Sequence, residues 1–195
     1  MIDLPITADV AFSLRAGDMV FLNGIVVTGR DKLHKFLFKE KPSRKKIPFN
    51  LEGSVLYHCG PIIKKIKGRY RVFAAGPTTS MRVEMYEYKI ISRYGLRGVM
   101  GKGGMGEKTL KALKKYGCVY FQTIGGAAVY LAEKVKFVVD VWKLEEFGMT
   151  EAMWFLNVQE FPAIVTMDAH GGNLHQEIEN SSYRKLKEIV DSDYS

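Results

Sequence analysis

Three basic residues stand at junctions between strand-like apolar runs and helix-like segments. Arg30 follows the run IVVTG, Arg82 follows AAGPTTSM, and Lys102 lies within MGKGGMG. In an α/β fold such junctions gather at the carboxyl ends of the strands, where the amide groups of helix N-termini favour anions. The pattern therefore predicts an anion site that contains three cations. Because Lys and Arg fill 29 of the 195 positions, the alternative is that these are ordinary solvated side chains.

The segment GPTTSMR opens the next predicted helix with three consecutive hydroxyl groups, on Thr78, Thr79 and Ser80. Thr and Ser are favoured capping residues, so we expect one of the three to cap this helix. If Thr78 or Thr79 is the cap, Arg82 lies in the first turn, where the helix dipole disfavours a cation by about 0.3–1 kcal/mol. A bound anion would remove that penalty. Capping by itself requires neither three hydroxyls nor an arginine.

The glycine-rich segment around Lys102 matches a nucleotide-binding loop only in part. Gly101, Gly103 and Gly106 satisfy the G-x-G-x-x-G spacing of dinucleotide-binding folds. Such folds place an acidic residue at the end of the next strand to bind the ribose, but the next strand, CVYFQT, ends without a carboxylate. The segment also lacks the Gly-Lys-Ser/Thr of a phosphate-binding loop. We therefore expect these glycines to let the backbone approach a small anion, with Lys102 as its counter-ion.

The remaining candidates for chemistry fit structural roles better. Asp168, His170 and His175 in DAHGGNLH match no standard metal-ligand spacing, and we expect them in turns or at helix ends. His58 and Cys59 end an apolar run with no acid in view to orient them, so we expect buried structure rather than a nucleophile pair. The sequence predicts no metal site in this chain.

The segments that position these residues alternate between strand-like and helix-like. Residues 19–29 are expected to form two strands joined by a tight turn at Asn23-Gly24, followed by a helix from about Asp31. Further strands are expected at GSVLYHCGP, YRVFAAGP, RGVMG, CVYFQT, KFVVDVW and PAIVTMD, and further helices at EKTLKALKKYG and AAVYLAEKV. The alternation predicts an α/β layer fold with a mixed, partly parallel sheet. With no repeat or linker, residues 1–195 are expected to form a single domain, whose polar tail after Asn173 includes a short helix.

The charge of the chain indicates an acidic partner. The formal net charge is +8, and much of the excess lies in residues 39–48, expected as an exposed loop of unassigned role, and in residues 64–71. The partner could be nucleic acid, an acidic subunit or an anionic substrate, but no nucleic-acid-binding motif accompanies the charge. No apolar run approaches the roughly 20 residues of a membrane span. The N-terminus lacks a signal-peptide layout, and the 2 cysteines form no disulfide framework, so we expect a cytoplasmic location.

Six motifs occur in the order found in one enzyme family. They are GRDKLH (29–34), YHCGP (57–61), AAGPTTSMR (74–82), MGKGG (100–104), TIGGAA (123–128) and EAMWFLNVQEFPAIVTMDAHGGNL (151–174). Over about residues 18–174 they resemble the β subunit of class I, iron–sulfur-dependent fumarate hydratase and of L-tartrate dehydratase. Each motif is weak alone, whereas GPTTS-x-R followed by GKGG is specific in combination. Leu33 departs from the usual pattern, because the family carries alanine at that position of GRDKLH.

The resemblance implies a swivelling β/β/α domain that closes the active site of a hydro-lyase, which hydrates fumarate reversibly to malate in the TCA cycle. It implies that Arg30, Arg82 and Lys102 bind the substrate carboxylates. Thr78 would remove the C3 proton, with Thr79 beside it, although Thr78 could instead only orient the substrate. A [4Fe–4S] cluster is implied on three cysteines of a partner α subunit. This chain, with 2 cysteines, is expected to bind no cluster and to be active only with that partner.

Two alternatives accompany this reading. The same carboxylate-binding motifs suit L-tartrate or a related hydroxy diacid, and the sequence does not choose between the substrates. A non-catalytic anion-binding or regulatory module, docked through its basic loops, would use the same cations without turnover. The enzyme is expected to be an α/β hetero-oligomer without a nucleic acid or membrane partner, and a homodimer is the alternative for the isolated chain.

Overall fold

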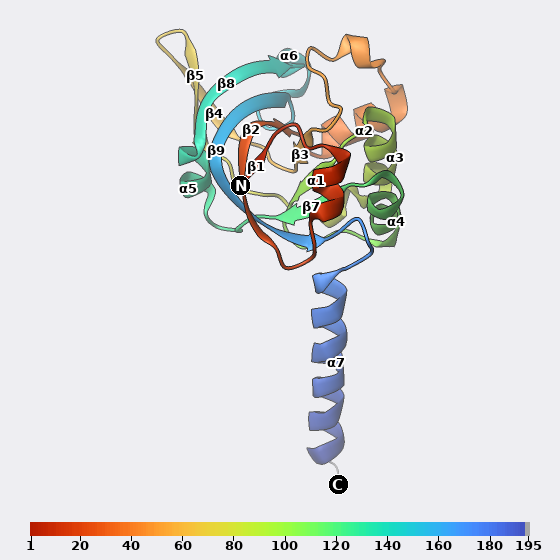
Figure 1. Cartoon of the computed structure of the whole chain (residues 1–195). Coiled ribbons are helices and arrows are strands. Elements are labelled where there is room, and N and C mark those ends of the chain that lie inside the picture. The colour runs from red at the N-terminus through yellow and green to blue at the C-terminus, as the bar shows by residue number, and fades with distance from the viewer. Residues whose placement is uncertain (194–195) are drawn as a thin grey trace.

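The computed structural model describes residues 1–193 of the chain, in which strands and helices alternate (Figure 1). The strands are β1 (Ile2–Asp3), β2 (Met19–Thr28), β3 (Val55–Tyr57), β4 (Ile62–Ile66), β5 (Arg69–Ala74), β6 (Gly98–Gly101), β7 (Val119–Gln122), β8 (Val135–Trp142) and β9 (Met153–Met167). The α-helices are α1 (Ala8–Ser13), α2 (Asp31–Glu40), α3 (Glu84–Tyr94), α4 (Glu107–Tyr116), α5 (Ala128–Glu133), α6 (Leu144–Phe147) and α7 (Leu174–Asp193). The described residues also form two short 3-10 helices, η1 (Arg44–Lys46) and η2 (Ser80–Val83).

The main sheet is mixed and closes on itself. β2, β3, β6 and β7 are parallel neighbours, and the long strand β9 pairs antiparallel with both β2 and β7. β8 pairs with the N-terminal half of β9, and β1 extends the sheet beside β2. Figure 1 shows β9 curving around the body of the molecule. The predicted α/β fold with a mixed, partly parallel sheet is confirmed.

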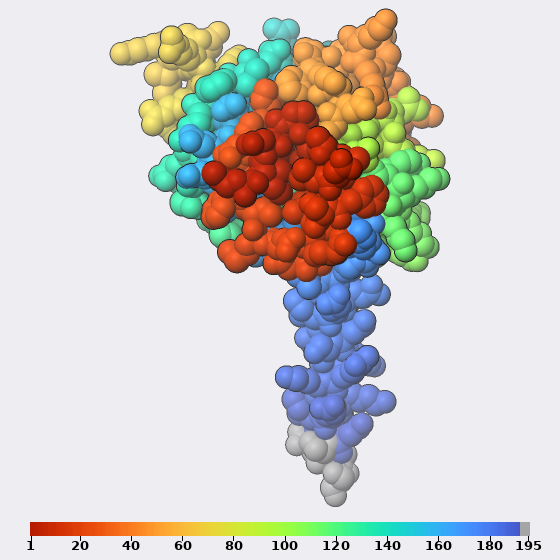
Figure 2. All heavy atoms as spheres, in the orientation of Figure 1, coloured from red at the N-terminus to blue at the C-terminus, as the bar shows by residue number. Residues whose placement is uncertain are grey.

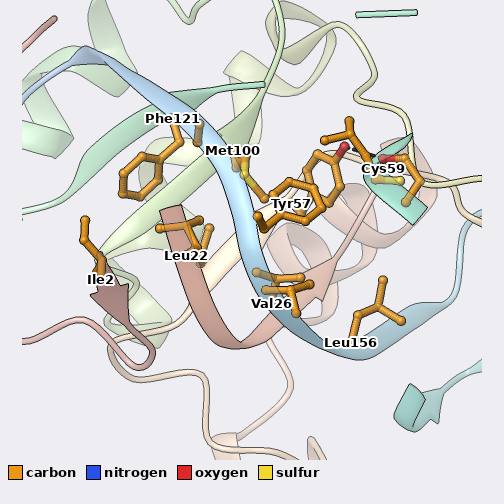
Figure 3. Packing of buried hydrophobic residues seen from close by; sticks show 14 of the residues in the cluster. Ile2, Leu22, Val26, Tyr57, Cys59, Met100, Phe121 and Leu156 are labelled. Carbon is orange, nitrogen blue, oxygen red and sulfur yellow. Dashed lines mark hydrogen bonds between the residues drawn. The ribbon is translucent and has the colours of Figure 1, made fainter. Parts of the chain in front are cut away.

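Side chains alternate across this sheet between two buried clusters, as expected when successive residues of a strand point to opposite faces. Val26 of β2 and Phe121 of β7 belong to the first cluster, where Figure 3 shows them near Leu22. Their chain neighbours, Val27 and Tyr120, belong to the second cluster. The strands are therefore buried on both faces, which explains why they read as continuous apolar runs.

Helices α2, α3 and α4 cover the second cluster and lie side by side in Figure 1. Each contributes fully buried aliphatic side chains, among them Leu37, Ile91 and Leu113. α3 and α4 end at Gly95 and Gly117, whose φ angles of 71° and 62° are left-handed. Glycine adopts this conformation at no steric cost, and α4 ends where the sequence predicts.

The predicted turn at Asn23-Gly24 is wrong. β2 passes through both residues as one strand, because its residues on either side of them pair with β9. The pairing register shifts between Leu22 and Gly24, and Gly24 has a φ of 111°. A side chain at Gly24 would lie 3.0 Å from the carbonyl oxygen of Leu4, so this glycine serves close packing rather than a hairpin.

The two basic segments differ in structure. Residues 64–71 lie in a hairpin of β4 and β5, which is connected through Lys67 and Gly68 with φ angles of 48° and 81°. β4 is not among the predicted strands. Residues 39–48 include the end of α2 and the short helix η1, and all their Lys and Arg side chains are exposed. The expectation of an exposed segment is confirmed there.

The C-terminal helix α7 projects from the body of the molecule (Figures 1 and 2). It has 20 residues, so the predicted short helix is too short. Residues 176–191 are all exposed, including the apolar side chains of Ile178, Tyr183, Leu186 and Val190. Among the described residues, no helix is both long enough and apolar enough to span a membrane.

Candidate functional site

The predicted site residues lie at the carboxyl edge of the parallel strands, where the loops after β3, β5 and β6 are joined by backbone hydrogen bonds. The amide of Thr78 donates to the carbonyl oxygen of His58 over 2.7 Å. The amide of Lys102 donates to Thr78 O over 3.3 Å, and the amide of Ser80 donates to Lys102 O over 3.0 Å. Thr79 and Lys102 thus form an isolated parallel bridge, which places the hydroxyl segment directly beside the glycine-rich loop.

The hydroxyl of Thr78 has a defined partner. Its Oγ1 donates to the carbonyl oxygen of His58 over 3.0 Å, and the residue is half-buried. Since a hydroxyl carries one hydrogen and two lone pairs, this bond leaves the oxygen of Thr78 able to accept a hydrogen bond or a proton. Thr79, in contrast, is exposed.

The predicted helix cap is wrong. Thr79 precedes the 3-10 helix η2, and its side chain makes no capping hydrogen bond. α3 begins only at Glu84, so Arg82 lies in η2 rather than in the first turn of an α-helix. The hydroxyl of Ser80 is fully buried and contacts His58 and Tyr120 instead of capping. The argument from the helix dipole therefore does not apply to Arg82.

Arg30 precedes α2 and lies among loop residues far away in the sequence. Its Nε is 3.6 Å from Oε1 of Glu151, and the two side chains are 24% and 20% exposed. The other oxygen of Glu151 accepts the amide of Lys32 over 2.9 Å, so this carboxylate occupies the N-terminus of α2. A methyl group at Gly60 would lie 2.5 Å from Cδ of Arg30, so the guanidinium stem packs directly on this glycine.

The other two cations differ in their partners. Arg82 forms an ion pair with Asp31, the residue after Arg30, which ties η2 to the start of α2. Lys102 is exposed and has no ion pair among residues 1–193. It lies at a cavity of about 330 Å³, whose lining also includes Phe21, Ile124 and Ile164. Two of the three cations therefore already face a carboxylate of their own chain.

Beneath these loops lies a buried polar cluster, which we call the His–Glu cluster: His34, His58 and Glu87. Oε2 of Glu87 is 2.8 Å from Nε2 of His34 and 3.1 Å from Nε2 of His58. Nδ1 of His58 lies 2.9 Å from Oγ of Ser80, which lies 2.8 Å from the hydroxyl of Tyr120. The expectation that His58 is a buried structural residue is confirmed. The sequence did not predict its hydrogen bonds to Ser80 and Glu87.

Burial and the proximity of opposite charges together set the pKa values of the His–Glu cluster. Burial alone would lower the pKa of His34, but the Glu87 carboxylate outweighs it and raises that pKa above its ordinary value. Burial alone would raise the pKa of Glu87, but the two imidazoles, chiefly His34, lower it to about 2. For His58 burial dominates, and its pKa is lowered. His34 and Glu87 thus form a buried ion pair beside a neutral His58.

Sequence reasoning missed this cluster, although one signal for it was present. Glu87 follows Val83 by four positions and precedes Ile90 and Ile91 by three and four, which is the spacing of one helix face. All four side chains are buried. A carboxylate in the middle of an apolar face requires a buried partner, so the pattern indicates a polar cluster without naming the partner.

The chain's own residues do not suit an iron–sulfur cluster. Cys59 belongs to the first buried cluster and Cys118 to the second, so the sheet separates the two sulfurs. Burial raises the pKa of both thiols, whereas cluster ligation needs thiolates. The His–Glu cluster has donor atoms within 4.8 Å of one another, but its nitrogen–oxygen distances are those of hydrogen bonds rather than of shared metal ligands.

The segment DAHGGNLH has the structural role that the sequence predicts. The carboxylate of Asp168 accepts the amides of Ala16, His170 and Gly172. His170 Nε2 lies 2.8 Å from the carbonyl oxygen of Phe12. These contacts tie the end of β9 to the N-terminal segment.

Known proteins share the sequence that builds this site. A family model described as the fumarase C-terminus matches residues 1–178. A Geobacillus stearothermophilus protein, provisionally named a class I fumarate hydratase, is 49% identical over 192 residues, which are 98% of this chain and 36% of that protein. A Methanocaldococcus jannaschii protein, provisionally named L(+)-tartrate dehydratase subunit beta, is 42% identical over 91% of both chains. The L(+)-tartrate dehydratase subunit beta of Escherichia coli is 39% identical over 87% of this chain and 83% of its own length.

These matches confirm the resemblance that the motifs indicated. The family model covers all six motifs. The relatives include both enzyme names that the resemblance suggested. The chain spans little more than a third of the Geobacillus protein but most of the two β subunits. From this extent of similarity we conclude that the chain belongs to the fumarase C-terminus family.

Proposed function

We propose that this chain is the β subunit of a hydro-lyase that hydrates fumarate reversibly to malate together with an α subunit. The observation that carries the proposal is the bridge between Thr79 and Lys102, which joins the hydroxyl segment to the glycine-rich loop at one edge of the sheet. Arg30 and Arg82 reach the same edge through the start of α2. A negatively charged substrate with two carboxylates would meet three cations there.

The cations would recognise the two carboxylates of the substrate. Glu151 and Asp31 now face Arg30 and Arg82, so a bound diacid shares these guanidinium groups with them or replaces them. Lys102, exposed beside the bridge, would bind a carboxylate without such competition. Thr79 is exposed at the same bridge, and its hydroxyl would donate a further hydrogen bond to the substrate.

In the dehydration direction, the C3–H and C2–O bonds of the hydroxy diacid break and the C2=C3 double bond forms. We assign the removal of the C3 proton to the oxygen of Thr78, and the protonation of the departing hydroxyl to an acid of the α subunit. Removal of the proton builds negative charge onto the adjacent carboxylate, which the cations stabilise. A neutral threonine is a weak base, so this role needs nearby positive charge when substrate is bound.

A [4Fe–4S] cluster is proposed for the α subunit and not for this chain, whose cysteines are buried in separate clusters. The E. coli relative's name, subunit beta, fits a protein that works with a partner. We also propose that the complex is cytoplasmic.

L-tartrate is the second candidate substrate. The two relatives that align over most of their own length are both named L(+)-tartrate dehydratase subunit beta. The same three cations would bind the carboxylates of tartrate. Comparison of the two diacids in one assay decides between the substrates.

The test is anaerobic turnover of fumarate and of L-tartrate by this chain alone and by this chain with a cluster-loaded α subunit. Activity is expected only in the mixture, and the faster substrate names the enzyme. Thr78→Ala should lower kcat by about 100-fold or more, the usual contribution of a positioned acid or base, while the complex still assembles. Thr78→Ser retains the hydroxyl and should keep much of the activity.

The matched control is Ser92→Ala, which also removes a hydroxyl that donates to a main-chain carbonyl, here that of Lys89 on α3. Its activity should equal that of the wild type. Full activity of Thr78→Ala would exclude Thr78 as the base. An assembled, cluster-loaded complex that turns over neither diacid would contradict the hydro-lyase proposal and favour a non-catalytic anion-binding module.

A further inference from the structure

The His–Glu cluster connects the two sides of the proposed site from below. On one side, the carbonyl oxygen of Arg30 accepts the amide of His34 over 2.9 Å and lies 2.7 Å from its Nδ1. On the other side, the carbonyl oxygen of His58 accepts both the amide and the hydroxyl of Thr78. Glu87 lies between the two imidazoles and contacts both. The cluster is therefore a continuous link between the Arg30 loop and the Thr78 loop.

The donors and acceptors of this link allow one arrangement of protons. Both partners of the His34 ring, the Arg30 carbonyl and the Glu87 carboxylate, are acceptors, so His34 carries two N–H groups and a positive charge. Nε2 of His58 also faces Glu87, so its Nδ1 accepts from the hydroxyl of Ser80. The Ser80 oxygen in turn accepts from Tyr120.

The cluster is sealed from water, so its geometry depends on these contacts alone. The side chains of His34 and Glu87 are 0% exposed and that of His58 is 1% exposed. Water cannot replace these contacts, so the pairing of both imidazoles with Oε2 of Glu87 fixes their positions, while the buried Oε1 of Glu87 has no hydrogen-bond partner among the described residues. The other titratable or charged groups around it are Arg30 and Asp31 at the start of α2, and Cys118 and Tyr120 at β7.

We propose that Glu87 and His34 are positioning residues, which hold the Arg30 loop against the Thr78 loop and so set the separation between the carboxylate-binding guanidinium and the reacting hydroxyl. The catalytic consequence rests on the proposed function. The positioning itself does not, because it can be measured on the full chain without substrate.

The experiment compares Glu87→Gln with wild type by native-state hydrogen exchange of two backbone amides. The amide of Thr78 reports the His58 side of the link, and the amide of His34 reports the Arg30 side. Glutamine carries no negative charge, so it cannot pair with the charged His34 ring as the carboxylate does, and exchange of both amides should accelerate at least tenfold. Unchanged protection of both amides would overturn the proposal.

Tyr94→Phe is the matched control. Tyr94 lies on the same helix, about two turns after Glu87, and donates a buried hydrogen bond to the carbonyl oxygen of Pro42. This variant loses a buried polar contact of α3 without touching the link. If it accelerates exchange at Thr78 as much as Glu87→Gln does, the effect is general destabilisation and the positioning role is wrong.

A second variant covers the case in which Glu87→Gln does not fold. Ser80→Ala removes only the contact of Ser80 with His58 and Tyr120, and it keeps the ion pair of His34 with Glu87. Exchange should accelerate at Thr78 and stay unchanged at His34. Equal protection of Thr78 in Ser80→Ala and wild type would contradict the link.

Activity in the reconstituted complex separates this inference from the proposed function. Glu87→Gln should lower kcat about tenfold or more relative to Tyr94→Phe, with a smaller change in KM, because the reacting groups are misaligned rather than lost. An inactive wild-type complex with altered exchange in Glu87→Gln would refute the proposed function and leave the link intact. Equal kcat for Glu87→Gln and Tyr94→Phe in an active complex would refute the positioning role and leave the function intact.

Discussion

Gly60 is the residue on which the Arg30 side chain rests. Its Cβ would lie 2.5 Å from Cδ of Arg30 and 2.7 Å from the carbonyl oxygen of Thr150, distances that real side chains do not tolerate. Gly60→Ala should therefore displace the guanidinium together with the backbone at Thr150. We expect kcat/KM of the reconstituted complex to fall about 10- to 100-fold, as misplacement of a binding group by about 1 Å does.

The control for this prediction is Gly125→Ala, beside Lys102. A Cβ there meets only Cδ of Lys102, at an ordinary 3.6 Å, so kinetics should stay at the wild-type level. Circular dichroism verifies the fold of both variants. Equal activity of Gly60→Ala and wild type would mean that the Arg30 position seen here is not the one used in turnover.

At the residue scale, the sequence predicts where the site residues lie in the fold better than it predicts which side chains contact them. Arg30, Thr78 and Lys102 follow apolar runs directly, and the rule that strand ends share an edge brings them together. The carboxylate of Glu151 reaches Arg30 only because the start of β9, more than a hundred residues later, pairs with the end of β2. No local pattern encodes such a contact, and the same holds for the partners of Glu87.

At the scale of single elements, α4 begins with a cap from another helix. The carboxylate of Glu84 accepts the amides of Gly106 and Thr109 and the hydroxyl of Thr109. Glu84→Ala should lower the free energy of unfolding by about 1–2 kcal/mol, the usual cost of a lost N-terminal cap. Urea denaturation measures the change.

Glu107→Ala is the comparison for that experiment. Glu107 lies in the first turn of the same helix but is exposed, and among residues 1–193 its ion pair is with Lys111. Exposed pairs contribute little, so its denaturation midpoint should stay close to that of the wild type. A smaller loss for Glu84→Ala than for Glu107→Ala would show that the cap does not stabilise α4.

The ion pair that joins α2 and α3 makes stability depend on pH. The pKa of Glu87 is lowered from 4.5 to about 2 in the folded chain, so its contribution is complete above pH 4.5 and is lost as pH falls from 4.5 towards 2. The contribution of His34 to stability depends on pH in the opposite direction, because the pKa of His34 is raised in the folded chain. This contribution is complete below pH 6.5 and is lost as the pH rises through the pKa of the folded state.

Carbon NMR of the Glu87 carboxyl, assigned by its loss in Glu87→Gln, tests this dependence. The resonance should remain that of a carboxylate at pH 3.5, where exposed glutamates are mostly protonated. Urea denaturation at a series of pH values should show that the free energy of unfolding decreases as the pH is lowered from 4.5. A Glu87 resonance that titrates near 4.5 would contradict the ion pair.

The sequence predicts the single helices and strands better than it predicts how the strands pair and where the chain turns. The helices beginning at Asp31 and Glu107 and the strands at 98–101 and 119–122 agree with the sequence pattern, because apolar period and glycine stops are local. The Asn23-Gly24 pair has the chemistry of a hairpin turn, but pairing with β9 on both sides keeps β2 extended. Tertiary contact thus overrides a strong local turn signal.

At the scale of the molecule, α7 contributes little to the stability of the body. Because residues 176–191 are exposed, we expect a deletion of residues 179–195 to leave the described core of the body unchanged. We expect Tm to stay within about 1 °C of the wild-type value, below the shift of about 2–4 °C that a loss of 1 kcal/mol causes in a chain of this size. The helical circular dichroism signal should decrease.

A longer deletion provides the contrast. Removal of residues 174–195 also takes His175, whose Nε2 lies 2.9 Å from Oγ1 of Thr166 and whose ring meets that of Tyr120. Tm should then fall by several degrees. A large loss of Tm in the shorter deletion would mean that the exposed part of α7 supports the body.

The closure of the sheet by β9 also orders the folding of this chain during synthesis. Residues 153–167 provide the antiparallel neighbour for both β2 and β7, and Met19 pairs with Ile164. Contacts between such distant positions form slowly, because a long loop must close before they stabilise anything. The parallel strands and their helices therefore leave the ribosome with two unpaired edges, and the sheet closes only after residues 153–167 have been made. Until then β2 and β7 are the edges at which nascent chains can aggregate.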